Sequence, residues 1–153
     1  MSKLDFSMNV DASVEQLMKL AIDYENYKNY LPQQIKDIKI IESSDDEIIT
    51  EEVLVFSSIL KKEIIVQSLH KKIDNNTLYT KIISGPAKGT EVTIHFISGK
   101  QTKISLSIDL KLSFKAKFLW PLIKKQYKLF LMGIFLKMNT TALEAQKTNF
   151  TEI

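Results

Sequence analysis

The chain begins with a strict alternation of apolar and polar side chains, which predicts a half-buried β-strand. Apolar residues at positions 4, 6, 8 and 10 are separated by Asp5, Ser7 and Asn9. The apolar spacing then becomes helical directly after Ser13. Ser13 and Gln16 match a capping box, in which the serine caps the first turn and the glutamine reaches back to it. We therefore expect a strand followed at once by a short amphipathic helix.

A second short helix is predicted over residues 24–30, where Tyr24, Tyr27 and Tyr30 recur at steps of three. Pro32 ends this helix, because the residue before a proline is pushed out of the α region. On an α-helix, steps of three drift by about sixty degrees, so the three rings would span an arc. We expect Tyr27 to pack under the sheet and the other two to lie at its rim. Whether Tyr27 or Tyr30 reaches a cavity stays open.

From residue 35 to residue 112 the pattern is that of strands joined by tight turns. Runs rich in isoleucine and valine are interrupted by turn-forming residues at 43–46, 74–76, 84–89 and 98–100. This short spacing favours antiparallel hairpins over parallel crossovers. The boundary between the runs at 48–57 and 63–70 stays open, since either 57–58 or 61–62 could hold the turn. The last run is the clearest, with isoleucine or leucine at every even position from 104 to 112.

Trp120 and Pro121 start a long helix, because proline is tolerated in the first helical turn. An apolar stripe then follows at steps of three and four: Ile123, Tyr127, Phe130, Ile134, Met138 and Ala142. Between residues 129 and 136 the apolar character spreads beyond this stripe. We therefore expect the sheet on one side of the helix and loops or short helices on its other flank.

This order of elements predicts an α+β fold. A strand and two short helices precede a six-stranded antiparallel meander, which curls around the long C-terminal helix, and the first strand returns to the sheet edge. With 153 residues the chain is long enough for one core, so we expect a single domain over 1–153 with its core at about 4–147. Such a curl leaves a cavity between sheet and helix wherever side chains do not fill it.

Composition excludes several function classes. The chain has no cysteine and two histidines, His70 and His95, so we expect neither a metal site nor a cofactor. Every basic residue is lysine, which lacks the planar fork that reads guanine edges, so we expect no nucleic-acid partner. The longest apolar run, 129–136, is far shorter than the roughly 20 residues that span a bilayer. Since residues 1–10 do not resemble a signal peptide, we expect a soluble cytoplasmic protein; its oligomeric state stays open.

Two groups of residues are candidate polar sites in the predicted cavity. Glu51 and Glu52 face opposite ways on a strand, so one of them can point inwards with a raised pKa, unless it lies at an edge or in a salt bridge. His95 alternates with the apolar face and is expected to point to solvent, but it is retained with Glu52 as a candidate polar cavity group. His70 is expected to end a strand beside Lys71 and to be exposed.

The segment 111–128 combines apolar side chains with lysines, and no acidic residue lies between Asp109 and Glu144. An apolar tip in a basic collar suits peripheral contact with an anionic membrane or with an acidic partner. The alternative is a solvated face with a packed tryptophan. The candidate contact residues are Phe114, Lys115, Lys117, Phe118, Trp120 and Lys124.

The stretch "VDASVEQLMKLAIDYENYKNYLP" resembles the N-terminal signature of the polyketide cyclase/dehydrase and coenzyme-Q-binding group of the START-like, helix-grip superfamily. The family pattern D-x-x-x-Y-x-x-x-x-P falls here on Asp23, Tyr27 and Pro32. "ISGPAKGTEVTIHF" is similar to the family's Gly-Pro stretch, although the tryptophan often found in the following strand is absent. The resemblance runs from Leu4 to about Ala145 and implies a helix-grip (START/Bet v 1-like) fold. It leaves function open, because the family includes lipid, quinone and hormone binders as well as aromatases and cyclases.

The resulting main hypothesis is a non-catalytic carrier of a hydrophobic small molecule, a lipid or an isoprenoid quinone. The candidate cavity lining is Tyr27, Tyr30, Phe56, Val66, Ile94, Phe96, Ile108, Leu110, Tyr127, Phe130, Ile134 and Met138. One alternative is an aromatase/cyclase-type enzyme acting on a polyketide-like substrate, which needs an inward acid, histidine or tyrosine. The other alternative is a docking module that uses segment 111–128. No residue is assigned a catalytic role.

Overall fold

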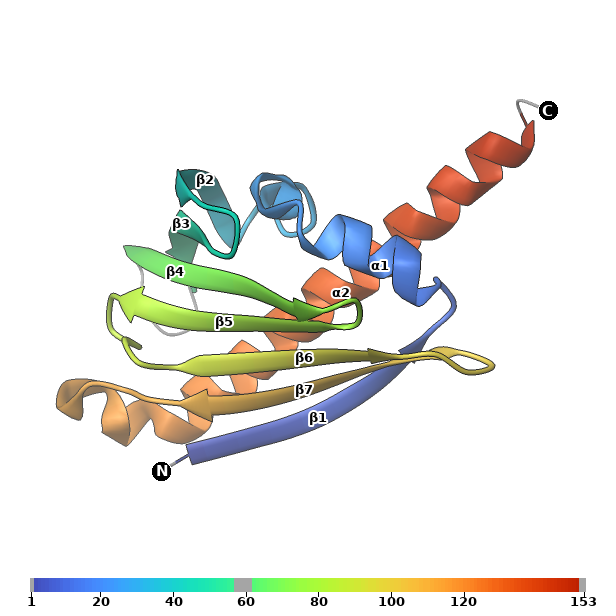
Figure 1. Cartoon of the computed structure of the whole chain (residues 1–153). Helices are drawn as coiled ribbons and strands as arrows, with labels where there is room; N and C mark the ends of the chain where they lie inside the picture. Colours follow the sequence, from blue (N-terminus) through green and yellow to red (C-terminus); the bar gives the residue numbers. More distant parts are fainter. Residues whose placement is uncertain (1, 57–61, 152–153) are drawn as a thin grey trace.

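In a computed structural model of the protein, which describes residues 2–56 and 62–151, one curved antiparallel sheet wraps around a long helix (Figure 1). The seven strands are β1 (Ser2–Val10), β2 (Ile35–Ser43), β3 (Ile48–Val55), β4 (Glu63–Asp74), β5 (Thr77–Ser84), β6 (Glu91–Ile97) and β7 (Thr102–Leu110). The helices are α1 (Val14–Ala21), α2 (Trp120–Thr151) and the 3₁₀ helices η1 (Tyr24–Asn29) and η2 (Phe114–Leu119). The predicted α+β helix-grip architecture is confirmed.

The sheet is a meander with one exception to sequential order. Its strands follow as β1-β7-β6-β5-β4-β3-β2, so the first strand pairs with the last. Ser2 lies opposite Leu110, and Val10 lies opposite Thr102. The return of the first strand to the edge, predicted from the sequence, is therefore confirmed, and Figure 1 shows β1 beside β7.

Helix α1 begins with the predicted capping box. The Ser13 side chain accepts a hydrogen bond from the Gln16 backbone N–H at 3.1 Å, and the Gln16 side chain accepts one from the Ser13 N–H at 2.9 Å. Just before this cap, the Ala12 N–H donates to Asn139 Oδ1 of α2 at 2.9 Å. The start of α1 is thereby tied to the C-terminal half of α2.

The tyrosine segment forms a 3₁₀ helix, and this corrects the expected arc of rings. A 3₁₀ helix has three residues per turn, so steps of three place Tyr24, Tyr27 and Tyr30 one above the other. Successive ring centroids are 5.7 Å and 5.8 Å apart. The burial order is also corrected: Tyr24 and Tyr30 are buried, whereas Tyr27 is half-buried and donates its hydroxyl to the Ala21 carbonyl.

The turns lie where the sequence places them, within the described residues. The turn after β5 contains Gly85 and Gly89, whose φ angles of 106° and 96° favour glycine. A side chain at Gly85 would also meet the Ile65 carbonyl oxygen at 3.2 Å. The boundary between β3 and β4, left open at 57–58 or 61–62, lies largely outside the described residues.

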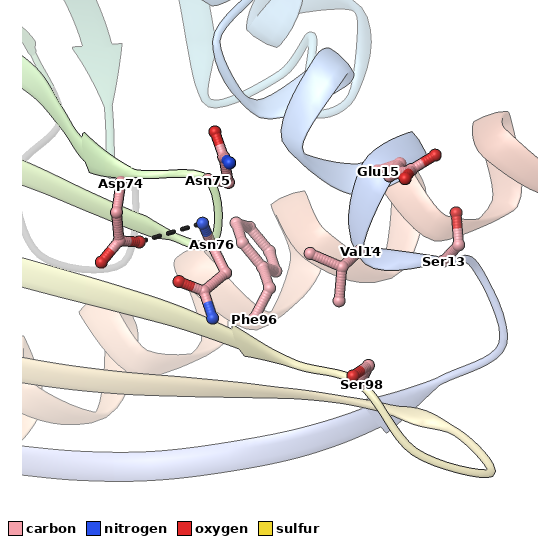
Figure 2. Close-up of a pocket in the computed structure, with 8 residues that line it drawn as sticks. All are labelled: Ser13, Val14, Glu15, Asp74, Asn75, Asn76, Phe96 and Ser98. Atoms are coloured by element: carbon pink, nitrogen blue, oxygen red, sulfur yellow. Dashed lines mark hydrogen bonds between the residues drawn. The ribbon is translucent and has the colours of Figure 1, made fainter.

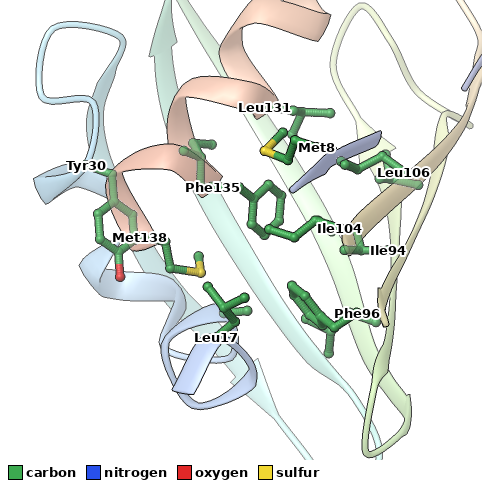
Figure 3. Packing of buried hydrophobic residues seen from close by; sticks show 14 of the residues in the cluster. Met8, Leu17, Tyr30, Ile94, Phe96, Ile104, Leu106, Leu131, Phe135 and Met138 are labelled. Atoms are coloured by element: carbon green, nitrogen blue, oxygen red, sulfur yellow. The ribbon is translucent and has the colours of Figure 1, made fainter. Parts of the chain in front are cut away.

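At the α1 end of the molecule the space between sheet and helix is filled by side chains (Figure 3). Phe96 of β6 and Phe135 of α2 meet edge to face, with ring centroids 6.1 Å apart. Leu17 from α1 and Met138 from α2 are fully buried beside them. This region is the closed part of the core.

Helix α2 begins at Trp120, as predicted, but one expectation about its flanks is only half right. Leu31 covers one flank at Gly133, where an added side chain would meet Leu31 Cδ2 at 3.4 Å. The same flank is open on either side of this contact, since Leu129 and Leu136, about one turn before and after Gly133, are 52% and 47% exposed. The apolar width of the helix therefore does not correspond to complete coverage, because the described residues cover this flank only locally.

Candidate functional site

Away from α1, the same gap between sheet and helix opens into a cavity of ≈ 630 Å³. Its walls are the inward faces of β2 to β7, the first half of α2, helix η1 and the segment around η2. The lining residues contributed by these strands are Ile35, Ile38, Glu52, Leu54, Ile64, Val66, Ser68, His70, Thr80, Ile82, Val92, Ile94 and Leu110. The lining from α2 is Ile123, Tyr127, Phe130, Leu131, Ile134 and Phe135. Most of this surface is apolar.

The structure divides the sequence-predicted lining residues into two groups. Those that line the cavity are Tyr27, Glu52, Phe56, Val66, Ile94, Leu110, Tyr127, Phe130 and Ile134. Those buried elsewhere in the core are Tyr30, Phe96, Ile108 and Met138. His95 is exposed on the outer face of β6, as its alternation predicts, and its Nδ1 lies 3.0 Å from the Thr77 hydroxyl. His95 is therefore not a cavity group.

A cluster of polar side chains interrupts the apolar lining on three neighbouring strands, and we call it the polar cluster. It consists of Thr50 and Glu52 of β3, Ser68 and His70 of β4, and Thr80 of β5. All except Thr50 line the cavity. Because inward positions alternate along each strand, register places these five side chains side by side on one face.

The polar cluster is held together by a continuous chain of hydrogen bonds. The Thr50 hydroxyl is 2.8 Å from Glu52 Oε1 and also 2.8 Å from His70 Nε2. On the far side of the ring, His70 Nδ1 is 2.8 Å from the Thr80 hydroxyl. The Ser68 hydroxyl donates to Glu52 Oε2 at 3.3 Å. Every polar atom of the Glu52 and His70 side chains thus has a neutral hydroxyl partner.

The position of His70 contradicts the prediction that it is exposed. Strand β4 runs on to Asp74, so His70 lies within it instead of at its end. Its alternation with Val66 and Ser68 turns it inwards, where it is 7% exposed. The Tyr24 ring stacks on the imidazole with centroids 4.0 Å apart. The same alternation, followed two residues further along the sequence, would have identified His70 as a cavity residue.

Burial shifts the two ionisable groups of the cluster towards their neutral forms. Desolvation raises the pKa of Glu52 to about 7, although hydrogen bonds from Thr50 and Ser68 oppose the shift. Desolvation lowers the pKa of His70 to about 4. Glu52 Oε1 and His70 Nε2 are 3.9 Å apart, but these shifts disfavour an ion pair between them. The pair is therefore part of a hydrogen-bonded network that is neutral between the pKa of His70 and the pKa of Glu52.

Two tyrosine hydroxyls add polar character to the cavity wall. Tyr24 and Tyr127 line the cavity, and neither hydroxyl makes a hydrogen bond to another described residue. Burial raises the pKa of Tyr24 to about 12. Burial, reinforced by the charge of Glu52, raises the pKa of Tyr127. Both hydroxyls therefore stay protonated near neutral pH.

Segment 111–128 lies at one end of the cavity. Ser113, Ala116, Phe118 and Leu119 contribute to its lining. Phe114 and Phe118 are nevertheless 88% and 78% exposed, Lys117 is exposed, and Trp120 is half-buried, whereas Lys115 lies outside the residues whose side chains the structure describes. Lys124, the last of the predicted contact residues, lies on the first turns of α2. The structure thus places exposed aromatic rings at an edge of the cavity.

A second, more polar pocket lies beside the start of α1 (Figure 2). It is bounded by the start of α1, the turn at 74–76, Phe96 and Ser98. Two of its polar side chains already serve local structure: Ser13 caps α1, and Asp74 Oδ1 accepts a hydrogen bond from the Asn76 N–H at 3.0 Å. We therefore assign the candidate site to the apolar cavity between sheet and α2.

Residues 2–56 and 62–151 contain neither a metal-ligand cluster nor a membrane-spanning helix. Within these ranges no three histidine, aspartate, glutamate or cysteine side chains are grouped as metal ligands would be. In the same part of the chain, no helix combines the length and the hydrophobicity that crossing a membrane requires.

Several solved structures share the architecture across almost the whole chain. The protein TTHA0849 from Thermus thermophilus matches with a TM-score of 0.80 at 18% identity, covering 94% of this chain and 99% of that one. A START superfamily protein from Mycobacterium smegmatis matches with a TM-score of 0.74 at 14% identity, covering 94% and 98%. The ZhuI aromatase/cyclase from Streptomyces sp. R1128 matches with a TM-score of 0.73 at 9% identity, covering 92% and 93%. At these identities the likeness concerns the fold.

Comparison with curated protein sequences gave no match. A family profile, in contrast, matches residues 10–129, which include α1, η1, the whole meander and the start of α2. Its description is polyketide cyclase / dehydrase and lipid transport. This match confirms the resemblance found in the sequence, and the chain belongs to the polyketide cyclase/dehydrase and lipid-transport family.

Proposed function

We propose that the protein binds and carries a hydrophobic small molecule, of the lipid or isoprenoid-quinone class, in the cavity between sheet and α2. The observation that carries the proposal is the apolar cavity of ≈ 630 Å³, which is large enough for a small organic ligand. Family membership supports the same class of function.

The aromatic side chains along the cavity favour a flat or elongated apolar ligand. Phe56 and Phe130 meet edge to face with centroids 5.2 Å apart, and the Tyr127 ring centroid lies 6.3 Å from that of Phe130. Such rings supply large apolar contact area for a ligand. Burying that area against the ligand is the main source of affinity.

The test is direct binding of a neutral aromatic hydrocarbon, 2-ethylnaphthalene, by equilibrium dialysis. We expect saturable binding to the wild-type protein. Leu54→Trp should weaken this binding by about tenfold or more, because the larger side chain occupies cavity volume. Val53→Trp on the same strand is the control, because its side chain points to the opposite face. Equal binding by both variants and wild type would contradict the proposal.

Identification of the natural ligand requires a separate measurement. Organic extraction of the purified protein, followed by mass spectrometry, should release a lipid or quinone in a ratio approaching one per chain. Extraction of Leu54→Trp prepared in the same way should release much less. A natural preparation with no extractable ligand, together with no hydrocarbon binding, would rule out a carrier.

A second candidate function is favoured by the polar cluster. A cavity with apolar walls alone would exclude an aromatase/cyclase-type enzyme, whereas Glu52 and His70 here line the wall. A carboxyl group whose pKa is about 7 can exchange a proton with a bound substrate at neutral pH. The test is deuterium exchange at the methyl group of 2-acetylnaphthalene, followed by NMR. Protein-dependent exchange that is lost in Glu52→Gln would support catalysis, and its absence would favour the carrier.

The exposed rings at the cavity edge support a delivery step at a membrane. Phe114 and Phe118 project beside Lys117 in a segment without acidic residues. Lysines near an anionic surface contribute about 1 kcal/mol each. We expect flotation with vesicles containing anionic lipid, and loss of flotation in Phe114→Ser/Phe118→Ser. Equal flotation with neutral vesicles would contradict an electrostatic contribution.

A further inference from the structure

The polar cluster has a hydrogen-bond balance that depends on one proton. It contains four internal contacts: Thr50 with Glu52, Ser68 with Glu52, Thr50 with His70, and His70 with Thr80. Each contact needs one hydrogen atom. The three hydroxyls and the neutral imidazole supply one hydrogen each, which gives four.

When Glu52 is ionised, all four hydrogens are used inside the cluster. The carboxylate can only accept, so Thr50 and Ser68 both donate to it. The Thr50 oxygen must then accept from His70, which places the imidazole proton on Nε2. His70 Nδ1 in turn accepts from Thr80. In this state the cluster offers acceptor lone pairs to the cavity and no spare hydrogen.

When Glu52 is protonated, the cluster holds five hydrogens for the same four contacts. With the proton on Oε1, Glu52 donates to Thr50, Thr50 donates to His70 Nε2, and His70 Nδ1–H donates to Thr80. The hydroxyl hydrogen of Thr80, a cavity-lining residue, is then free. With the proton on Oε2, the free hydrogen belongs to Glu52 or Ser68. In every arrangement one donor is left for a ligand, and the added proton comes from solvent.

The groups around Glu52 leave its proton as the variable that changes near neutral pH. From β4 it meets His70, whose depressed pKa keeps the ring neutral. From η1 and α2 the titratable groups are Tyr24, Tyr27 and Tyr127, all with raised pKa values. On β3 itself Glu51 faces outwards, where Lys39 lies 3.7 Å away. Lys62 also lines the cavity, from an exposed position.

We infer that the polar cluster is a binding site for the uncharged oxygen-containing head group of an otherwise apolar ligand. It binds a hydroxyl group whether Glu52 is protonated or ionised, but it binds a carbonyl group mainly when Glu52 is protonated. A hydroxyl can donate to the carboxylate or accept the spare hydrogen. A carbonyl can only accept. The inference rests on the proposed binding function and adds the class of head group and its position in the cavity.

The test compares three ligands that differ only at one carbon: 2-ethylnaphthalene, 1-(2-naphthyl)ethanol and 2-acetylnaphthalene. Affinities are measured by equilibrium dialysis at a pH of about 6 and of about 8. We expect the ketone to bind several-fold more weakly at the higher pH, up to about tenfold. The reason is that the fraction of protein with Glu52 protonated, the form that can donate to a ketone, falls as the pH rises. The alcohol should change by less than about twofold, and the hydrocarbon should not change.

Three variants connect this pattern to the cluster. Glu52→Gln keeps a hydrogen-bonding amide without a titrating proton, so its ketone affinity should be independent of pH. Glu51→Gln is the matched control and should retain the wild-type pH dependence, because its carboxylate lies on the outer face. Thr50→Val removes the hydrogen-bonded link between Glu52 and His70 and should also weaken the pH effect. Circular dichroism checks that all three variants are folded.

The outcomes separate this inference from the proposed function. If the hydrocarbon does not bind at all, the proposed function is wrong. If the hydrocarbon binds while ketone and alcohol show the same pH dependence, the head-group assignment is wrong. A ketone pH dependence that persists unchanged in Glu52→Gln would also overturn it.

Discussion

The two ends of the space between sheet and α2 share the sheet and the helix but differ in the elements that flank them and in how they are filled. At the α1 end, the fully buried side chains of Leu17, Phe96 and Met138 fill the space between sheet and helix. At the other end, η1 and η2 flank the helix in place of α1, and the sheet carries polar side chains at inward positions. The difference shows that one curved sheet can support a closed core and a cavity side by side.

In this arrangement the closed end mainly stabilises the fold, and the cavity end provides the space for a ligand. The closed end contains the fully buried aromatic and methionine side chains, whose packing holds the helix on the sheet. The cavity end keeps Glu52 and His70 in positions where an apolar pair would pack more favourably. The comparison therefore predicts large stability effects at the closed end and pH-dependent effects at the cavity end.

The largest effect should come from removing an aromatic ring at the closed end. Phe96→Ala should lower the free energy of unfolding by about 3–5 kcal/mol, because it leaves a void in a packed region. Phe130→Ala, at the cavity, should cost less than about 2 kcal/mol, since its ring already borders empty space. Urea denaturation of both variants measures the difference. Equal losses would contradict the division into a closed end and a cavity end.

The next effect concerns Glu52 and the pH dependence of stability. Its folded-state pKa is raised from 4.5 to about 7, so its favourable contribution is complete below about pH 4.5 and is lost as the pH rises towards 7. The shift corresponds to about 3 kcal/mol. Glu52→Gln should therefore gain stability relative to wild type between about pH 5 and pH 8. Denaturation at both pH values checks this, and Glu51→Gln should show no such gain.

His70 should act in the opposite direction. Its folded-state pKa is lowered from 6.5 to about 4, so its contribution is complete above about pH 6.5 and is lost as the pH falls through 4. His70→Gln should flatten the acid side of the stability profile by about 2–3 kcal/mol, whatever its effect at neutral pH. His95→Gln on the outer face is the control. A matching change in the control would contradict a special role for the buried ring.

The smallest effect tests how α1 is held at the closed end. Ser13→Ala should cost about 1 kcal/mol, because it removes the acceptor for the Gln16 N–H. Thermal unfolding monitored by circular dichroism should detect this loss. Ser98→Ala, in the loop after β6, should have little effect. A loss with Ser13→Ala that also weakened hydrocarbon binding would indicate that the two ends are coupled.

Most of the fold could be predicted from the sequence because its signals are local. The alternation in β7, the capping box at Ser13 and the turn at Gly85 depend on neighbouring residues alone. The coverage of α2 could not be predicted in the same way, since Leu129 and Leu136 look equally apolar whether or not another element packs on them. Coverage depends on which elements the topology brings near, and the periodicity of one helix does not contain that information.

The candidate site could be predicted only in part, for a similar reason. Apolar lining residues such as Val66 and Ile134 follow from periodicity, but Phe96 and Met138 share that periodicity and lie in the closed end. The polar cluster depends on the registers that join β3, β4 and β5, and the prediction for His70 is wrong because it ends the strand too early. The prediction for the tyrosines is wrong because the helix type, α or 3₁₀, changes which residues align.

The pairing of β1 with β7 has a consequence for the order in which the chain can fold. Ser2 leaves the ribosome well before its partner Leu110, which follows more than a hundred residues later. Closing such a long loop precedes any gain from the pairing, so topology of this kind slows folding. During synthesis β1 therefore has no strand partner until β7 has been made. Moving β1 to a position after α2 by circular permutation would shorten the loop between β1 and β7 and should accelerate refolding.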